Sequence, residues 1–153
     1  MDDIAKVLIL EKNCAQLIAL TVWLQQFPEL DVVGSMSVTE LKQSIDKNLT
    51  LEYDLIIYGL EIGNSEEVPL ELAMSLSLVR KVKSKAYAPA VILLTNCLNE
   101  GQTNNTTTQM SHQLLRESDA QLLMTDSLKD CYREITRLLS YKYANKTPAI
   151  KAG

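Results

Sequence analysis

The chain has little of what most enzyme sites are built from. His112 is its only histidine, so a Ser-His-Asp or Cys-His-Asn site has only one candidate base and no further support. The cysteines, Cys14, Cys97 and Cys131, stand apart without C-x-x-C spacing, which is typical of reduced, buried thiols rather than of a zinc site. Neither G-x-G-x-x-G nor G-x-x-x-x-G-K-[ST] occurs, which excludes the common backbone cradles for dinucleotides and nucleoside triphosphates. We therefore expect no catalytic residue, no metal ion and no cofactor.

Positive charge and long apolar segments are scarce as well. The formal net charge is -4, so the chain lacks the excess of Lys and Arg that grips a phosphate backbone. It opens with Met1, Asp2 and Asp3 and then a short apolar run, which is neither a signal peptide nor a membrane span. These absences predict a cytoplasmic protein that binds neither nucleic acid directly nor a membrane.

The residues that are present fit one globular domain. With 153 residues, 46% of them hydrophobic and 22% charged, the chain can bury roughly two-thirds of its unfolded surface. We predict a single domain over residues 1–140. The tail over residues 141–153 contains Lys142, Lys146 and Lys151 but no acidic residue, and is expected to be frayed.

Short apolar runs alternate with segments of helical periodicity along the chain. The apolar runs predict buried strands over residues 5–10, 31–36, 53–58, 90–94 and 121–124. Apolar residues at helical spacing predict helices after the N-cap candidates Asn13 and Ser37, and over residues 69–85, 110–117 and 128–139. Polar composition predicts loops over residues 59–67 and 96–108, the second of them mobile.

Strands alternating with helices predict a parallel sheet, because each right-handed crossover helix packs back onto a face of the sheet. The predicted fold class is α/β, a three-layer, doubly wound, five-stranded parallel sheet in the flavodoxin-like order 2-1-3-4-5, since a closed barrel needs eight strands. Ligands of such sheets collect at the carboxyl ends of the first and third strands, so functional residues are expected there.

Several segments resemble the receiver domain of two-component response regulators, over about residues 4–140. The segment from Val7 to Lys12 is similar to the family's first strand and its acidic end, and the segment 30–34 to the second strand of receivers found in front of helix-turn-helix domains. The segment from Asp54 to Gly63 is similar to the phosphoacceptor strand and the loop after it, and 91–95 to the fourth strand. The order and spacing of these segments carry the resemblance, which implies a chemotaxis-receiver-like fold.

In that family, two acidic residues after the first strand and an aspartate after the third bind Mg²⁺, and a Thr or Ser and a Lys complete the site. Carried over position by position, the acidic pair falls on Glu11 and Lys12, the phosphoacceptor on Gly59, the hydroxyl on Thr95 and the lysine on Met124. Only Glu11 and Thr95 match the family pattern.

The departures from the pattern remove the phosphorylation chemistry. Gly59 has no side chain that could become an acyl phosphate, and one carboxylate beside an ammonium is a poor ligand set for Mg²⁺. Met124 removes the cation that contacts the phosphoryl group, and Gln121 stands where the family often has a switch aromatic residue. A slip of one residue in the alignment brings Asp54 or Glu61 nearer the pocket, but Asp54 begins its strand and is expected to be structural.

Two roles are open for Lys12. Its ammonium either lies where the metal would lie and pairs with Glu11 or Glu61, which locks one conformation, or it is solvated at the surface. Unchanged stability and partner affinity in Lys12→Ala would exclude the first role.

The first and last predicted helices offer a candidate interface. Trp23 and Phe27 stand one turn apart, and the last helix presents Tyr132, Leu139 and Tyr143. Receivers commonly pair through the first and fifth or the fourth and fifth helices, so the resemblance implies these faces as contacts. Packing of Trp23 and Phe27 against the last helix of the same molecule is the alternative.

The leading hypothesis is a pseudo-receiver. It is a phosphorylation-independent protein–protein interaction module in signal transduction or transcriptional regulation, which binds another signalling or regulatory protein and could form a homodimer. The alternative is a small-molecule or anion sensor that uses the switch-point cleft around Glu11, Lys12, Gly59 and Thr95, and that a ligand would stabilise against heat. No enzymatic activity is predicted, because no pair of nucleophile and base can be named.

Overall fold

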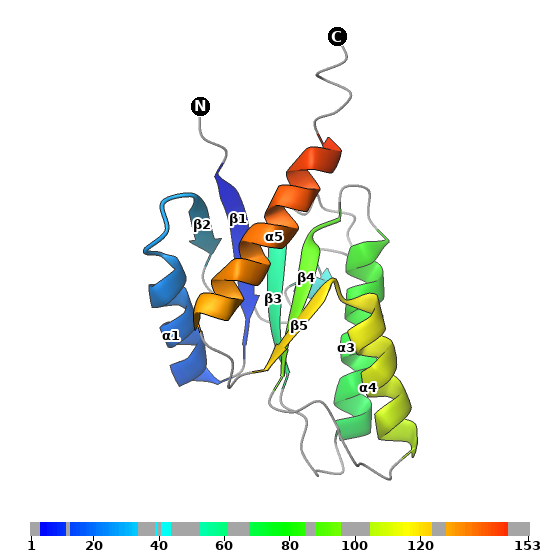
Figure 1. Ribbon diagram of the computed structural model, residues 1–153. Helices are drawn as coiled ribbons and strands as arrows, with labels where there is room; N and C mark the ends of the chain where they lie inside the picture. The colour runs from blue at the N-terminus through cyan, green and yellow to red at the C-terminus, as the bar shows by residue number, and fades with distance from the viewer. Residues whose placement is uncertain are drawn as a thin grey trace.

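The structure is a computed structural model of the chain, and it describes residues 4–11, 13–33, 39, 41–43, 53–60, 68–84, 88–95, 105–123 and 128–146. Strands and helices alternate along these residues (Figure 1). In chain order the elements are β1 Ala5–Leu10, α1 Cys14–Leu24, β2 Leu30–Val33, β3 Leu55–Leu60, α3 Val68–Lys83, β4 Ala90–Thr95, α4 Asn105–Glu117, β5 Ala120–Leu123 and α5 Leu128–Lys146.

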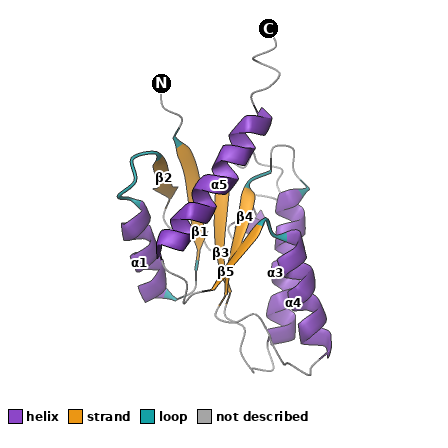
Figure 2. Ribbon diagram, in the orientation of Figure 1, coloured by secondary structure: helices purple, strands orange, loops and turns teal. Residues whose placement is uncertain are grey.

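The strands form one five-stranded sheet in the order β2-β1-β3-β4-β5, and every neighbouring pair is parallel. Figure 2 shows the strands in the middle of the molecule, with α5 lying across one face of the sheet beside α1. Helices α3 and α4 pack side by side. This arrangement confirms the predicted fold class and its strand order.

Alternate residues of each strand contribute to two separate hydrophobic cores, because successive side chains of a strand point to opposite faces. Val7 and Ile9 of β1 pack in the core under α1 and α5, where Leu24 and Ile135 are also buried. Leu8 of β1 packs in the opposite core under α3 and α4. Burial on both faces explains why these strands are almost wholly apolar in sequence.

The N-terminus of α1 is capped as predicted. The side chain of Asn13 accepts a hydrogen bond from the backbone N–H of Gln16 at 3.1 Å, which satisfies one of the free donors of the first turn. The predicted helix after Ser37 falls mostly outside the described residues, but Thr39 and residues 41–43 are helical and Leu41 is buried.

Several element boundaries differ from the sequence prediction, among them the end of β3 and the start of α4. Strand β3 continues to Leu60, because Gly59 and Leu60 still pair with Leu94 and Thr95 of β4, so the loop does not begin at Gly59. Helix α4 begins at Asn105, and residues 105–108 are therefore helical rather than part of a loop. Asn and Thr are favoured both at helix N-caps and in turns, so a polar composition did not distinguish the start of a helix from a loop.

Helix α5 extends to Lys146, so the predicted boundary at residue 140 falls inside a helix. Of the tail that was expected to be frayed, residues 141–146 are helical and residues 147–153 lie outside the described part of the chain. No helix among the described residues is long and apolar enough to cross a lipid bilayer.

Two aspartates tie neighbouring strands together at the end of the sheet where the strands begin. Asp54, just before β3, accepts a hydrogen bond from the backbone N–H of Lys6 at 3.0 Å, and its own N–H donates to the carbonyl oxygen of Lys6 at 2.8 Å. Asp119, just before β5, makes the same pair of bonds with Val91, at 2.7 and 2.9 Å. These contacts give Asp54 the structural role that its place before the strand predicts.

The Asp119 carboxylate yields a testable stability difference. It also accepts a hydrogen bond from Nζ of Lys83 at 2.7 Å, in a partly exposed ion pair. Asp119→Ala is expected to cost about 1–3 kcal/mol of unfolding free energy, because the N–H of Val91 loses its acceptor. Asp119→Asn keeps an acceptor and loses only the ion pair, so it should cost less than about 1 kcal/mol. Urea unfolding measures both variants, and equal costs would contradict this assignment.

Candidate functional site

The candidate site lies where β1, β3 and β4 end. Glu11 directly follows β1, Gly59 is the next-to-last residue of β3, and Thr95 is the last residue of β4. Strand register brings these ends together, because Leu10 pairs with Tyr58 and Leu60 pairs with Thr95. Three of the residues predicted to form the pocket are therefore grouped at the carboxyl ends of the central strands.

The carboxylate of Glu11 fills the space directly above the backbone of Gly59. A Cβ atom at position 59 would overlap Oε2 of Glu11, and would lie 2.6 Å from its Cδ and 3.2 Å from its Oε1. Glycine permits this close approach, because with any other residue the end of the Glu11 side chain would have to move away. The carboxylate at the centre of the site comes from the end of β1 rather than from β3.

Thr95 is fully buried, with 0% of the residue exposed. The Thr95 hydroxyl is therefore shielded from solvent by the residues around it. Gln121, the predicted switch position, is instead exposed on β5 at the edge of the sheet. Lys12, Met124 and Glu61 lie outside the described residues, so their predicted roles stay predictions.

The described residues do not fit the Mg²⁺ ion that the receiver fold implies. No three His, Cys, Asp or Glu side chains in the described part of the chain lie close enough together to hold a metal ion. Mg²⁺ requires six oxygen ligands in near-octahedral geometry, usually with carboxylates among them. Glu11 supplies one carboxylate at the strand ends, and Gly59 contributes no side chain.

Four of the five predicted interface residues have described side chains, and these four divide into two groups. Trp23, Phe27 and Tyr132 form one half-buried aromatic cluster, in which the rings of Phe27 and Tyr132 stack at 3.9 Å and the ring of Trp23 meets both edge-on. Trp23 and Phe27 thus pack against the last helix of the same molecule. Leu139 is 6% exposed and belongs to the core, which leaves it little surface to offer a partner. The side chain of Tyr143 is outside the described part of the structure.

A hydrogen bond between helix α5 and the turn before β2 holds the aromatic cluster. The hydroxyl of Tyr132 donates to Oε1 of Glu29. This bond lowers the pKa of the exposed Glu29 carboxyl, with a further contribution from its own backbone N–H. The same bond raises the pKa of Tyr132, helped by partial burial and by the negative charge of Glu29.

This hydrogen bond should make the effect of Tyr132→Phe depend on pH. The lowered pKa of Glu29 gives stability above its ordinary pKa of 4.5, which is lost as the pH falls through the folded-state value. The raised pKa of Tyr132 gives stability below 10.0, which is lost as the pH rises through the folded-state value. Tyr132→Phe should therefore be less stable than the wild type at neutral pH, and the difference should shrink in acid. Urea unfolding at several pH values tests this, with Glu29→Gln as the uncharged control.

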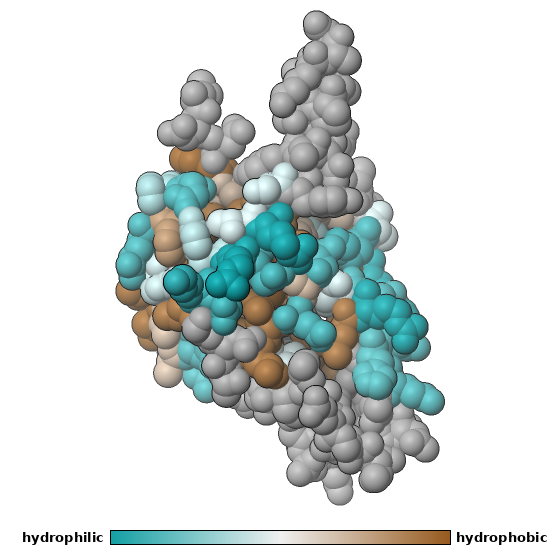
Figure 3. Space-filling view, in the orientation of Figure 1, coloured by the Kyte–Doolittle hydropathy of each residue, from teal (hydrophilic) through white to brown (hydrophobic). Residues whose placement is uncertain are grey.

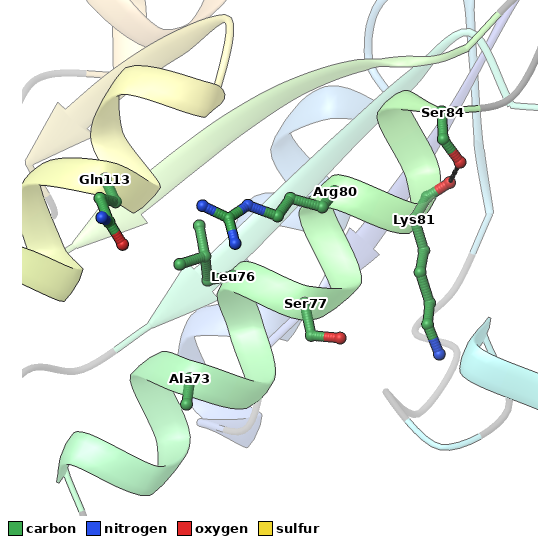
Figure 4. A pocket seen from close by; sticks show the side chains of 7 residues that line it. All are labelled: Ala73, Leu76, Ser77, Arg80, Lys81, Ser84 and Gln113. Carbon is green, nitrogen blue, oxygen red and sulfur yellow. Dashed lines mark hydrogen bonds between the residues drawn. The ribbon is translucent and has the colours of Figure 1, made fainter.

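An open groove runs along α3, away from the strand ends that form the candidate site. Its volume is about 490 Å³, and it is lined by Ala73, Leu76, Ser77, Arg80, Lys81, Ser84 and Gln113. Figure 4 shows Arg80 reaching toward Gln113 of α4, whereas Lys81 extends to the other side of the helix. Nε of Arg80 donates to both carboxylate oxygens of Glu117, at 3.0 and 2.8 Å. The charge that faces this groove from Arg80 is therefore already paired.

Receivers are among the solved structures that match this architecture. The isolated receiver domain of RcsB from Salmonella enterica serovar Typhimurium matches with a TM-score of 0.61 at 17% identity, over 90% of this chain and 90% of that one. A response regulator CheY-like protein from Mesorhizobium loti matches with a TM-score of 0.56 at 11% identity, over 89% and 99%. A chain of the complex between the P1 domain of CheA3 and CheY6 from R. sphaeroides matches with a TM-score of 0.59 at 13% identity, over 90% and 98%.

These likenesses show that the chain has the fold of response-regulator receiver domains. At such low identity they show the fold alone. No protein-family model matches the sequence, and no curated protein matches it.

Proposed function

We propose that the protein is a pseudo-receiver, a receiver-fold module that binds another signalling or regulatory protein without being phosphorylated. The single observation that carries this proposal is the carboxylate of Glu11 lying over the backbone of Gly59. In a phosphorylatable receiver that space belongs to the aspartate that accepts the phosphoryl group. Here the residue in the strand has no side chain, and the carboxylate above it is attached to a different strand.

Glu11 does not replace the missing aspartate chemically. An acyl phosphate needs a carboxylate that is open to the donor and accompanied by a metal ion that neutralises the phosphoryl oxygens. The described residues offer no ligand set for such an ion, and Thr95 is buried. A carboxylate in this position also repels anions, which disfavours the anion-sensor alternative for the same cleft.

The surface of α1 supports a role in protein binding. The helix contains no charged residue, and Ile18 and Val22 on its outer side are 56% and 57% exposed. Figure 3 shows hydrophobic side chains over α1, in contrast to the hydrophilic band over α5. Contiguous exposed apolar patches mark protein-interaction sites, whereas single exposed apolar side chains are normal on any surface.

Some of the structural neighbours were solved with a bound partner, which is either a protein or DNA. One neighbour comes from a complex of CheY6 with the P1 domain of CheA3. Others are RcsB structures bound to DNA. For this chain, whose net charge is -4, a protein partner is the better supported of the two classes.

The proposal predicts that the amount of bound partner does not change when a phosphoryl donor is added. The immobilised full chain would be exposed to native cytosol with and without acetyl phosphate and Mg²⁺, and captured proteins quantified by mass spectrometry. We expect a specific partner that is captured to the same extent under both conditions. Capture that changes severalfold with the donor would contradict phosphorylation independence, and the absence of any specific partner would contradict the interaction role.

A further inference from the structure

A small cavity lies between α1 and α5, above the ends of β4 and β5. Its volume is about 210 Å³. Helix α1 contributes Gln16, Ala19 and Leu20, and the other lining residues are Leu94, Leu122, Leu123, Leu128 and Cys131. Of the candidate site's described residues, Glu11, Gly59, Thr95 and Gln121, none lines the cavity, although Leu94 pairs with Gly59 in the sheet.

The walls of the cavity are preformed. Leu20, Leu94, Leu122 and Cys131 are all buried members of the core under α1 and α5, so their side chains are fixed by packing. Ala19 is exposed and Leu128 is 43% exposed, so the cavity opens to solvent between the two helices. A ligand can therefore enter without a rearrangement of the core.

The lining chemistry selects an uncharged, apolar occupant. Among the described residues that line the cavity, none is charged and only Gln16 carries a side-chain amide. Water needs two to four polar partners to be held in such a place, and this lining offers few. A charged ligand would lose its hydration without gaining a counter-charge from any of these described residues.

The volume sets the size of the occupant. An apolar cavity of about 150 Å³ is enough to bind benzene, whereas pockets for drug-sized molecules start at about 300 Å³. A cavity of about 210 Å³ lies between these limits. It holds one ring or one compact branched group with a single polar substituent, for which the amide of Gln16 is the available hydrogen-bond partner.

We infer that this cavity is a binding site for a small uncharged molecule of about the size of one aromatic ring. The inference is independent of the proposed docking role, because it rests on a cavity inside the α1–α5 layer and not on the apolar outer face of α1. It assigns the protein a ligand site between α1 and α5, whose described lining residues include neither Glu11 nor Gly59.

Benzyl alcohol and benzoate are matched probes, because they share a carbon skeleton and differ in charge. In a titration followed by ¹H–¹⁵N correlation spectra, benzyl alcohol should bind the full chain saturably in the millimolar range, as its few heavy atoms allow. The amides of Ala19, Leu123 and Cys131 should shift, while those of Ala73 and Gln113 in the α3 groove should not. Benzoate should bind at least tenfold more weakly.

Two alanines on α1 provide a matched pair of variants. Both Ala15 and Ala19 are exposed, but only Ala19 lines the cavity. Ala19→Leu should abolish the saturable shifts, and Ala15→Leu should leave them unchanged. Cys131→Phe, which fills the cavity from α5, is a second test should either alanine variant fold poorly.

Three results would overturn the inference. These are the absence of saturable shifts in the wild type, equal binding of benzyl alcohol and benzoate, and unchanged binding in both Ala19→Leu and Cys131→Phe. A further contrary result is self-association that Ala19→Leu removes, because the cavity would then receive a side chain from a second copy. The first three outcomes are measured with the ligand probes alone, so they leave the proposed function to its own capture experiment.

Discussion

Replacing Gly59 with aspartate is expected to destabilise the protein by about 2 kcal/mol and not to create a phosphorylation site. The new side chain would start where the carboxylate of Glu11 lies, so Glu11 must turn away. Its side chain is flexible, so the steric part of the cost is limited. Two carboxylates then share one small volume, which raises the pKa of at least one of them. The cost should therefore fall as the pH is lowered toward 4.

The cause can be isolated with two companion variants in urea unfolding experiments. Gly59→Asn adds the same shape without charge, so it should cost less than Gly59→Asp at neutral pH. In the Glu11→Ala background, Gly59→Asp should be tolerated, which gives a coupling free energy of about 1–3 kcal/mol between the two positions. An equal cost of Gly59→Asp with and without Glu11 would contradict the close approach of the two residues.

The double variant Ile18→Glu, Val22→Glu should lower partner affinity about 30-fold or more, because it places charge in the centre of the exposed face of α1. Both side chains are more than half exposed, so the free energy of unfolding should change by less than about 1 kcal/mol. The measurement is quantitative capture of the partner found with the wild type, together with urea unfolding of the variant.

Gln25→Glu, Gln26→Glu provides the matched control. These two residues are exposed just after the end of α1, and the substitutions add the same charge outside the apolar face. The control should bind the partner as the wild type does. If the control lost as much affinity as the Ile18, Val22 variant, net charge rather than the apolar face would explain the effect.

The sheet could be predicted from the sequence because its signals are local. Strands β1, β3 and β4 are short, almost wholly apolar runs, and burial on both faces requires that composition. The N-cap at Asn13 is equally local, since cap and partner lie three residues apart. The strand order followed from the alternation of strands with helices.

The arrangement at the strand ends could not be predicted in the same way. The sequence places Glu11 after β1 and a glycine near the end of β3, but nothing local states that the glutamate side chain turns over that glycine. That contact depends on strand register and on a rotamer, and the residues are far apart in sequence. The same holds for Tyr132 and Glu29, whose hydrogen bond joins α5 to the turn before β2.

The end of β3 differs from the prediction for another physical reason. Glycine has a low propensity for strands, so Gly59 was predicted to begin a loop. The parallel pairing of β3 with β4 nevertheless continues through Gly59, because Leu94 and Thr95 of β4 lie opposite Gly59 and Leu60. Tertiary pairing thus overrides a local preference at the position on which the functional interpretation depends most.

The most direct test of the central claim is the intact mass of the wild-type chain after incubation with acetyl phosphate and Mg²⁺. A receiver that retains its phosphoacceptor aspartate, treated in parallel, shows that the donor is active. We predict that the mass of this chain stays unchanged, because the end of β3 presents a glycine beneath the carboxylate of Glu11. A stable gain of one phosphoryl group on an acidic residue at the strand ends would contradict the account.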